Sequence, residues 1–425
     1  MYIFPLLFIN IRLLMYTGFM GERNYGSVHW AMKFLWSVAR GGVSLLFHRN
    51  TIRVNALEKR IKGPAVIVCN HVSMFDWYFV SQAVRHSPFH MVMGRYFLGE
   101  KRFDNLMKVG GVIPKAVFAH DNASAIASMR ALRRGAVLAV FPEARLGVSG
   151  RLESIPLENI AMLKRLALPV YGVHIDGASL MNPKWGHRRD GALVEVSAKQ
   201  LFDGETLSKA SLQDVEAALY RYVWFDDYAF LERHPEVHYR CKSPAEKLEN
   251  AAWVCPGCGK EFTLKSKGAT ITCSECGFTA VMDDRFRLSR GPATAQGWYD
   301  LAVDHLYQEA AAAGDAFRLA SPVTLKVLSH AKGKGQREAG EGTCILDRNG
   351  LSYRGTMDGR DIRLDFPLEG MYVLPFGSGK NWISYDDKTF CYIFCPEEPR
   401  SCTKWYVASA CLKGIPLPQN RKGFS

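Results

Sequence analysis

We predict from the sequence an α/β domain in which helices flank a mostly parallel sheet. A small cysteine-bearing module and a small antiparallel β domain with a C-terminal helix follow it. From about residue 50 to residue 240, short apolar runs alternate with helical patterns, as in proteins whose helices cover a parallel sheet. Two Cys-x2-Cys pairs come next, and beyond residue 320 several short strands with turn signals precede one last helix.

The bulk composition indicates a folded chain with more than one domain and a preference for anionic partners. The chain has 425 residues, of which 48% are hydrophobic and 22% are charged, a globular composition too long for one ordinary core. Its formal net charge of +13 favours nucleic acid, anionic lipid surfaces or phosphorylated substrates, and a basic surface without a partner is the alternative. The 11 cysteines, with no secretory signal expected before them, fit a reducing compartment better than a disulfide framework.

Residues 1–48 are predicted to form two membrane-associating helices. Tyr2–Phe19 is mostly apolar, but Asn10 and Arg12 interrupt it near its middle, and a spanning helix needs about 20 apolar residues. We therefore expect a monotopic segment that lies in one leaflet, with a helix of the protein core as the alternative. Ser27–Phe47 is the second helix, with apolar residues at helical spacing and added positive charge. Together they predict a peripheral or monotopic protein on the cytoplasmic face of a membrane.

The α/β domain is assigned to residues 49–240. Short apolar runs indicate its strands and apolar residues at helical spacing indicate its helices, with glycine and proline between them. The predicted strands are residues 51–54, 65–69, 89–93, 111–113, 137–141, 170–175 and 192–196, and the predicted helices are residues 76–84, 101–109, 122–134, 157–166 and 214–231. This alternation predicts a largely parallel sheet.

A histidine and an aspartate stand directly after the buried strand at residues 65–69. Asn70 and His71 lie where this strand gives way to a loop, and Asp76 follows His71 five positions later. Polar side chains gather at such strand ends in open α/β sheets, and an imidazole takes up a proton near neutral pH. Asp76 is close enough in sequence to hold the other ring nitrogen, which makes the pair a candidate base with its orienting group. A structural histidine beside a helix-capping aspartate is the alternative.

Residues 251–284 carry two cysteine pairs with the spacing of a metal site. Cys255 and Cys258 form the first Cys-x2-Cys pair, and Cys273 and Cys276 form the second. Four thiolates at this spacing can surround one ion as a tetrahedron, and the glycine after each pair frees the backbone that turns toward the sulfurs. The pattern predicts a zinc ribbon with a structural zinc. No catalytic metal is expected, because cysteine fills every corner of the tetrahedron.

The rest of the chain is predicted to be a helical linker at residues 295–320 and a β domain at residues 321–415. The predicted strands are residues 343–347, 351–354, 361–366, 371–374, 381–385 and 389–394, and the last helix is residues 403–412. This order of elements resembles that of a pleckstrin-homology or GRAM-type barrel. Four cysteines here have irregular spacing and are interpreted as buried thiols, with a second metal site as the alternative: Cys391, Cys395, Cys402 and Cys411.

Two stretches of the α/β domain carry a more specific pattern. Asn70–Asp76 reads Asn-His-x-Ser-x-x-Asp, with Ser73 as its serine, and Phe141-Pro142-Glu143 ends a later strand. These stretches correspond to two ordered blocks of one enzyme family. The first stretch matches its block in full, and the second matches the first half of the block Phe-Pro-Glu-Gly-Thr-Arg. On these motifs and their separation, residues 27–240 resemble the 1-acylglycerol-3-phosphate acyltransferase (PlsC-like) family of glycerolipid acyltransferases.

Other blocks of that family are matched more loosely. The second block holds an arginine thought to meet the acceptor phosphate, and here Gly110–Pro114 leads to Lys115 instead. Lysine is a point charge and lacks the two-pronged fork of arginine. Arg145 stands one position earlier than the arginine of the third block, and Pro169–Val173 departs from Pro-Ile-x-Pro-Val. These departures leave the histidine and aspartate intact and concern the contacts to the acceptor.

The resemblance implies acyl transfer in phospholipid biosynthesis, with membrane lipid as a partner. The donor is acyl-CoA or acyl-carrier protein, and the acceptor is the hydroxyl of 1-acylglycerol-3-phosphate or of a related lysophospholipid. His71 is then the general base and Asp76 its orienting group, with no acyl-enzyme. The implied substrate contacts are Asn70, Ser73, Lys115, Glu143 and Arg145. Glu143 would bind acceptor hydroxyls or orient basic side chains. Arg145 and Lys115 are the candidates for the phosphate, with plain surface charge as the alternative.

Three other functions are weighed against this one. The loose acceptor blocks leave open an O-acyltransferase for a non-phosphate acceptor. The added ribbon and β domain leave open a non-catalytic lipid- or protein-binding adaptor with a relic acyltransferase domain, although intact His71 and Asp76 argue against it. Nucleic acid is not expected as a partner, because the ribbon is not strongly basic.

Overall fold

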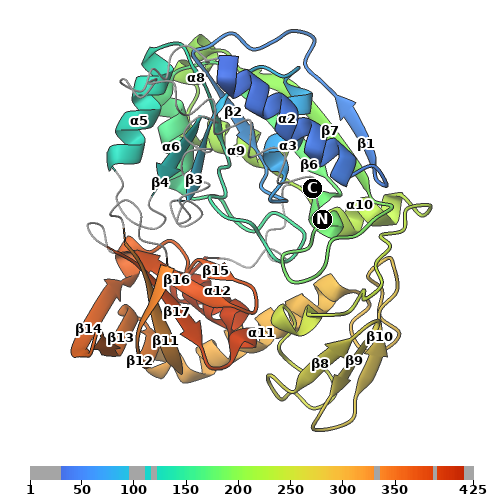
Figure 1. Ribbon diagram of the computed structural model, residues 1–425, viewed down its shortest axis with the longest axis vertical. Coiled ribbons are helices and arrows are strands. Elements are labelled where there is room, and N and C mark those ends of the chain that lie inside the picture. The colour runs from blue at the N-terminus through green and yellow to red at the C-terminus, as the bar shows by residue number, and fades with distance from the viewer. Residues whose placement is uncertain (1–29, 95–110, 116–121, 330–335, 386–389, 416–425) are drawn as a thin grey trace.

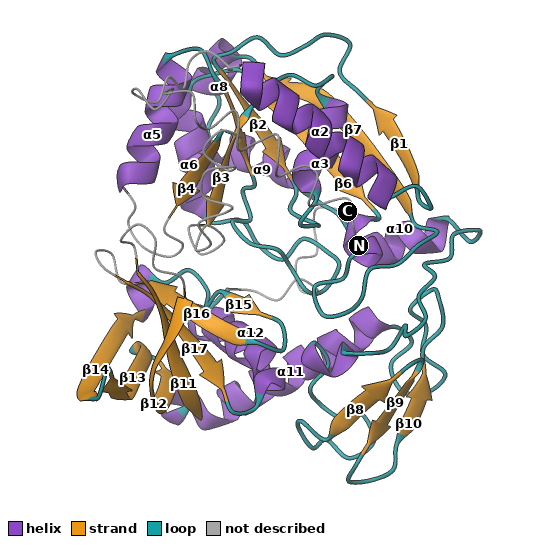
Figure 2. Cartoon of the chain, viewed as in Figure 1, coloured by secondary structure: helices purple, strands orange, loops and turns teal. Residues whose placement is uncertain are grey.

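The computed structural model describes residues 30–94, 111–115, 122–329, 336–385 and 390–415. The apolar segment at residues 2–19 and the predicted helix at residues 101–109 lie outside these ranges. Figure 1 shows three parts: the α/β domain above, the C-terminal β domain below it, and the cysteine ribbon beside the latter. The colouring by secondary structure in Figure 2 separates the helix-covered upper sheet from the two antiparallel sheets below.

The sheet of the α/β domain has seven strands in the order β1-β7-β6-β2-β5-β3-β4. The strands are β1 (Thr51–Asn55), β2 (Ala65–Cys69), β3 (His90–Gly94), β4 (Val112–Lys115), β5 (Val137–Val140), β6 (Val170–Asp176) and β7 (Leu193–Phe202). The five strands from β6 to β4 are parallel, but β7 pairs antiparallel to β6 and β1 runs with β7. The sheet is therefore mixed. The expectation of a mostly parallel sheet holds for the five strands that surround the histidine, and it is wrong at the β7 edge, where the chain turns back beside β6.

Helices cover both faces of this sheet. They are α2 (Trp30–Leu46), α3 (Asp76–Ala83), α5 (Asn122–Arg133), α6 (Leu157–Leu166), α7 (Ala178–Met181), α8 (Gly204–Lys209), α9 (Leu212–Val223) and α10 (Asp227–Arg233). The connection from β2 to β3 through α3 runs along the sheet toward β4. The connections through α5 (β4 to β5) and α6 (β5 to β6) run the opposite way. Because such crossovers are right-handed, α3 lies on one face of the sheet and α5 and α6 lie on the other. All five residues of β2 are buried as a result, as expected for a central parallel strand.

The single helix predicted at residues 214–231 is two helices. Asp226 interrupts it and caps α10 by accepting hydrogen bonds from the backbone N–H groups of Tyr228 and Ala229. An aspartate in this role satisfies donors that the first helical turn leaves unpaired. The new helix start matters for the site, because Asp227 beside it reaches the end of β6.

Helix α2 confirms the second predicted helix from Trp30 onward and packs on α3 through aromatic side chains. Trp36 contacts Trp77 edge-on, and Phe47, just after the helix, packs against Phe75. Other apolar side chains of α2 face outward, with Phe34 53% exposed. Within the described part of the chain, no helix combines the length and the apolar character that crossing a membrane requires.

The cysteine ribbon is a three-stranded antiparallel sheet of β8 (Leu264–Lys267), β9 (Thr270–Cys273) and β10 (Thr279–Val281). The Arg285 guanidinium just beyond it donates to the carbonyl oxygens of Leu231, His234 and Val237 at the end of α10. A cation is favoured there, because the last carbonyls of a helix lack partners within the helix. The ribbon is thus anchored to the α/β domain.

The C-terminal β domain follows α11 (Ala295–Ala313), and its sheet has the order β14-β13-β12-β11-β17-β16-β15. The strands are β11 (Leu319–Ser329), β12 (Gln336–Asp347), β13 (Gly350–Met357), β14 (Arg360–Pro367), β15 (Phe376–Gly377), β16 (Asn381–Tyr385) and β17 (Phe390–Pro396). Every pairing is antiparallel, and α12 (Cys402–Leu412) comes last. The expected antiparallel sheet with a C-terminal helix is present, whereas its assignment to a pleckstrin-homology or GRAM-type module stays a prediction.

Two strand assignments in this domain differ from the structure. Residues 371–374 form no strand; Val373 and Leu374 are buried, and the Leu374 N–H donates to Ser409 of α12. Their apolar pattern reflects packing on that helix instead of a place in the sheet. Sequence reasoning also missed β11, although its alternating burial follows an alternating pattern of side chains.

Candidate active site

His71 lies just beyond the carboxyl end of β2, where the neighbouring parallel strands β5 and β6 also end. Its Nδ1 is 2.7 Å from Oδ2 of Asp76, which also accepts the Val72 N–H at 2.9 Å. Asp76 is the first residue of α3, where a carboxylate is favoured by the unpaired N–H groups of the helix start. The five-residue spacing thus closes a short loop that holds the imidazole, as the sequence predicts.

The electrostatics of this pair suit a base and its orienting group. The carboxyl side chain is 2% exposed and the imidazole is 24% exposed, so His71 is the member of the pair that an incoming molecule can reach. Burial raises the pKa of Asp76, and the hydrogen bond and charge of His71 oppose that rise. A neutral imidazole that donates Nδ1–H to Asp76 has its free lone pair on Nε2. The Phe141 ring stacks on the imidazole with 4.6 Å between centroids and fixes its plane.

Glu143 joins the second motif to the first. Its Oε1 accepts the backbone N–H of His71 at 2.7 Å, and its side chain is buried at 1% exposure. Burial raises its pKa well above the usual value, while the His71 hydrogen bond and the charge of Arg145 oppose the rise. Glu143 therefore holds the backbone of the histidine in place. This burial suits a supporting role better than the predicted contact with acceptor hydroxyls.

Asn70 and Ser73, predicted substrate contacts, are both fully buried and bonded within the protein. The Asn70 side chain donates to the Ile175 carbonyl at 2.7 Å and accepts the Ile175 N–H at 2.9 Å, which clamps β2 to β6. Ser73 Oγ accepts the Phe75 N–H at 3.2 Å in the turn before α3. Both side chains therefore shape the loop around His71, and their contact with a substrate stays a prediction.

The two predicted phosphate-binding cations lie in different places. Lys115 ends β4 and is partly exposed at the same edge of the sheet as His71. The strand order puts β5 and β3 between β2 and β4, so the two strand ends are about 14 Å apart. Arg145 is instead turned away from His71: its Nε donates to Tyr406 at 2.9 Å and its Nη2 to Ser154 at 2.6 Å. Of the two, only Lys115 lies at the sheet edge where His71 lies, and its contact with a phosphate stays a prediction.

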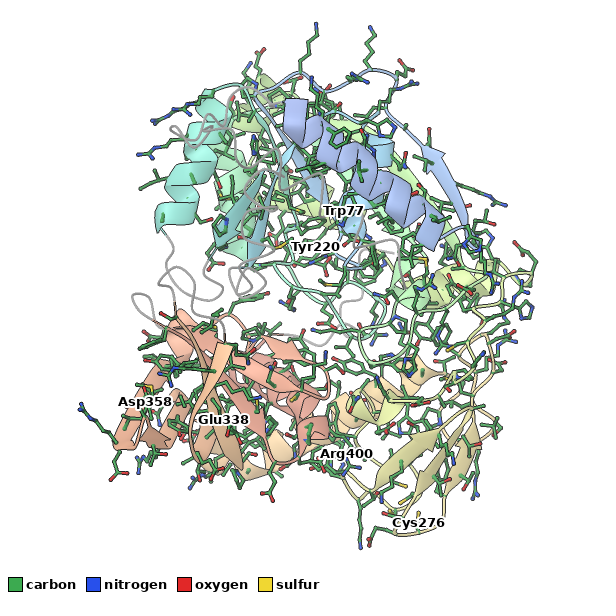
Figure 3. The ribbon with its side chains drawn as sticks, in the orientation of Figure 1. Trp77, Tyr220, Cys276, Glu338, Asp358 and Arg400 are labelled. Carbon is green, nitrogen blue, oxygen red and sulfur yellow. The ribbon has the colours of Figure 1, made fainter. Side chains whose placement is uncertain are left out.

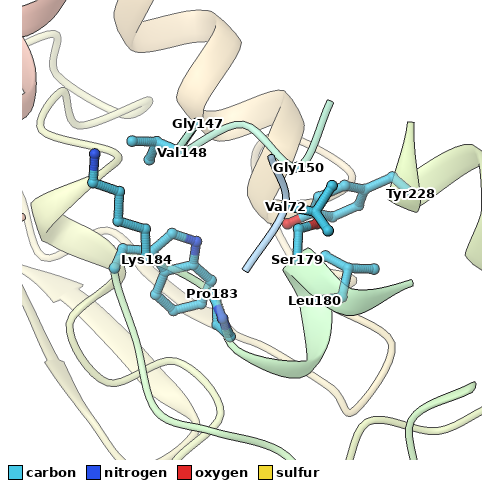
Figure 4. A pocket seen from close by; sticks show the side chains of 10 residues that line it. Val72, Gly147, Val148, Gly150, Ser179, Leu180, Pro183, Lys184 and Tyr228 are labelled. Carbon is cyan, nitrogen blue, oxygen red and sulfur yellow. The ribbon is translucent and has the colours of Figure 1, made fainter. Parts of the chain in front are cut away.

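A small pocket lies beside the backbone that follows His71. Figure 4 shows Val72, Ser179, Leu180 and Tyr228 around one end of it and Lys184 at the other. The Lys184 Nζ donates to the Leu146 carbonyl at 2.9 Å, and burial lowers its pKa to about 7. The pocket is thus polar at one end and close to the candidate base.

The four predicted cysteines converge as a metal site requires. Their sulfur atoms lie within 4.8 Å of one another, with 3.7 Å between Cys255 and Cys276 and 3.9 Å between Cys258 and Cys273. Four thiolates about 2.3 Å from one zinc ion would be about 3.8 Å apart. Gly259 and Gly277 both adopt positive φ, as expected of the glycines after each pair. The residues therefore fit a structural zinc.

The metal site is remote from the histidine. Figure 3 shows Cys276 at the outer tip of the ribbon and Trp77, next to Asp76, on the other side of the molecule. Among the described residues, metal-ligand side chains also gather at Glu261, His305 and Glu309, but the Lys404 ammonium already bonds both glutamates. Within the same ranges no metal cluster includes the four C-terminal cysteines. Cys391 and Cys402 are buried, as predicted, whereas Cys395 and Cys411 are only partly buried.

Sequence reasoning missed three residues that surround Arg145. Tyr372 and Tyr406 are more than 200 positions from Arg145, Glu153 follows it by eight positions, and no local pattern marks any of the three. One signal was present: Ala144 stands where the family block has glycine, and it adopts φ +57°, a conformation that glycine reaches without strain. That substitution marks the loop as unusual.

Two family models match parts of the chain. The model described as Acyltransferase matches residues 51–189, and the model described as DNA directed RNA polymerase, 7 kDa subunit, a zinc-ribbon model, matches residues 249–288. A solved structure of the 1-acyl-sn-glycerophosphate (LPA) acyltransferase PlsC from Thermotoga maritima shares 17% identity over 51% of this chain and 87% of that chain, with a TM-score of 0.39. No curated protein matches. Residues 51–189 therefore form a domain of the acyltransferase family, and residues 249–288 form a zinc ribbon.

Proposed function

We propose that the chain is a glycerolipid O-acyltransferase of phospholipid biosynthesis. It moves a fatty acyl group from acyl-CoA or acyl-carrier protein to the hydroxyl of 1-acylglycerol-3-phosphate or a related lysophospholipid. The observation that supports this most is the 2.7 Å hydrogen bond between His71 and buried Asp76, in a domain that matches the acyltransferase family. An alcohol is a weak nucleophile at its own pKa, so a positioned base is what this reaction needs.

In the proposed reaction His71 Nε2 accepts the proton of the acceptor hydroxyl, and the oxygen attacks the thioester carbon. The carbon–sulfur bond then breaks, and the departing thiolate takes the proton back from the imidazole. Asp76 stabilises the imidazolium between the two steps through Nδ1. Glu143 keeps the histidine backbone in place through its bond to the N–H, and no acyl-enzyme forms.

Membrane attachment is part of the proposal, because the acceptor and the product are lipids. We place the protein on the cytoplasmic face as a peripheral or monotopic protein. In support, Phe34 and Leu45 of α2 are 53% and 59% exposed, on a helix that also carries Lys33 and Arg40. Apolar side chains of this kind insert at a bilayer surface and cations attract anionic lipid. Changing Phe34 and Leu45 together to Glu should reduce flotation with anionic vesicles, whereas Val281→Glu on the ribbon should not.

The decisive experiment for the reaction offers the purified full chain a panel of lysophospholipids with acyl-CoA or acyl-carrier protein and identifies the products by lipid mass spectrometry. His71→Ala should lower the rate roughly 1,000-fold or more, because it removes the general base. His238→Ala is the matched control, since His238 also bonds an aspartate, Asp284, at 2.9 Å but lies by the ribbon. Turnover by His71→Ala at the wild-type rate would contradict the proposal.

A second candidate differs only in the acceptor. Arg145 is bonded to Tyr406 and Ser154, so only one of the two predicted phosphate contacts, Lys115, has no such partners within the protein among the described residues, and this supports an acceptor with a non-phosphate polar head group. The same panel separates the two when it includes a monoacylglycerol. A preference for 1-acylglycerol-3-phosphate that Lys115→Ala abolishes would exclude this second candidate.

A further inference from the structure

The loop at residues 141–156, which joins β5 to α6, is buried along most of its length. Residues 151–156 are buried without a break, although loops usually run over the surface, where water satisfies their polar groups. Helices α11 and α12, which come later in the chain, cover the loop. Gln296 of α11 donates to the Ser149 carbonyl at 3.1 Å, and Arg151 pairs with Asp300 of α11.

The same loop carries the residue that supports the histidine. Glu143 bonds the His71 N–H, and Arg145 two positions later points to the C-terminal β domain. Ala144 between them has φ +57°, a left-handed turn that sends the two side chains to different partners. Ala144 thus joins the residue that holds the His71 backbone to the residue that contacts the C-terminal β domain.

Tyr406 of α12 holds Arg145 and Glu153 with one hydroxyl group. That hydroxyl accepts from Arg145 Nε at 2.9 Å and donates to Glu153 Oε2. Glu153 in turn accepts the Val148 N–H at 3.1 Å within the loop. Tyr372 adds a second link, since its hydroxyl donates to Ser154 at 2.8 Å. Tyr406 and Glu153 are nearly inaccessible to solvent, so these bonds are not exchanged for bonds to water.

We propose that Tyr406 is a positioning residue of the acyltransferase site and that the C-terminal β domain is a working part of that site. Tyr406 acts on the reaction through Arg145, the loop backbone and Glu143, and it touches no substrate. This inference rests on the proposed function. A contact that only stabilised the interface would have an effect on kcat that does not depend on Glu143, whereas the effect of a positioning residue does.

The test compares Tyr406→Phe with wild type in the full-chain acyl-transfer assay. The change removes both hydroxyl bonds and keeps the ring, and we expect kcat to fall about tenfold with KM for the acyl donor unchanged, since a small displacement of a catalytic group is costly. Tyr353→Phe is the matched control, because the Tyr353 hydroxyl bonds only within its own sheet, to the Thr356 carbonyl at 2.9 Å. It should leave kcat unchanged.

A double-mutant cycle with Glu143→Gln distinguishes positioning from general stabilisation. If Tyr406 acts through Glu143, adding Tyr406→Phe to Glu143→Gln lowers kcat by less than twofold. The same tenfold loss in both backgrounds would overturn the inference while leaving the proposed function standing. Wild-type protein that acylates no acceptor in the panel would overturn the proposed function, and this inference with it.

Hydrogen exchange measures the positioning directly and does not depend on residual activity. In Tyr406→Phe, peptides that cover residues 143–150 should exchange several-fold faster than in wild type, because the Val148 amide loses a firmly held acceptor. Tyr353→Phe should leave the same peptides unchanged. Unaltered exchange of these peptides in Tyr406→Phe would overturn the inference.

Discussion

The charge of Asp76 is the residue-scale feature on which the proposed chemistry depends most. The Asp76→Asn variant keeps the size of the side chain but removes the negative charge that stabilises the imidazolium, so we expect kcat to fall at least about 100-fold with little change in KM. Steady-state kinetics with the best acceptor of the panel provide the measurement. Asp361→Asn, an exposed change of the same kind on β14, should leave kcat unchanged. Equal kcat in the Asp76 variant and wild type would exclude the orienting role.

Ala144 is a second residue whose backbone makes a prediction. Its φ of +57° is costly for a residue with a Cβ and easy for glycine. Ala144→Gly should therefore raise the free energy of unfolding by about 1 kcal/mol, measured by urea denaturation. Ala125→Gly, at an exposed position within α5, should lower it by a similar amount, because glycine disfavours a helix interior. A lower stability of the Ala144 variant would contradict the strain argument.

At the scale of single elements, the ribbon depends on its metal. Its three strands contain three or four residues each, too few to form a stable core alone, so zinc binding supplies folding energy. Cys273→Ser should abolish stoichiometric zinc and lower the melting temperature, measured by elemental analysis and circular dichroism. Cys395→Ser should retain one zinc per chain, because Cys395 lies in β17 outside the cluster. A zinc-free wild-type protein with an unchanged melting temperature would remove the site.

The junction of β6 and α10 makes the stability depend on pH. Asp227 accepts from the N–H groups of Gly177 and Ser179, yet burial raises its pKa to about 7 from 3.8. Between about pH 4 and pH 7 the folded protein keeps a proton on Asp227 that the unfolded chain has released. The stability that comes from the raised pKa of Asp227 is thus fully present below about pH 4 and is lost as the pH rises through 7.

We therefore expect Asp227→Asn to flatten this part of the pH dependence. Relative to the variant, wild type should lose a few kcal/mol of unfolding free energy between pH 4 and pH 7. Urea denaturation at several pH values measures the difference. Asp214→Asn in α9 makes the same change of charge as a control. Parallel curves for wild type and Asp227→Asn would show that Asp227 does not titrate in this window.

At the scale of the whole molecule, one lysine ties three parts together. Lys404 of α12 is 8% exposed, and its Nζ lies 2.7 Å from Glu261 of the ribbon and 2.9 Å from Glu309 of α11. Lys404→Met leaves two neighbouring carboxylates without their cation, so the free energy of unfolding should fall by about 2 kcal/mol. Thermal denaturation provides the measurement. Lys260→Met, which breaks the exposed pair with Glu275, should change little, and equal effects of the two variants would contradict the role of burial.

Sequence reasoning succeeded where a pattern was local. The histidine motif, the four cysteines and the strand before His71 could all be read within a few dozen residues. It failed for residues 371–374, whose apolar side chains pack on α12 and so produce the pattern of a strand. It also failed to predict that β7 runs antiparallel to β6, because the direction of a strand depends on the neighbour with which it pairs. It also assigned Arg145 to a phosphate, because an arginine near a motif gives no sign of a tyrosine 261 positions away.

The sequence by itself determined the His71–Asp76 pair and the zinc site, since their members are held by short loops whose closure depends on nearby residues. Tertiary structure alone decided what Glu143 and Arg145 do. Glu143 meets the His71 N–H across 72 residues, because β2 and β5 lie side by side in the sheet. Arg145 is committed to Tyr406 because the C-terminal β domain covers the loop. Glu143 therefore supports the His71 backbone, and Arg145 links its loop to Tyr406 and Ser154.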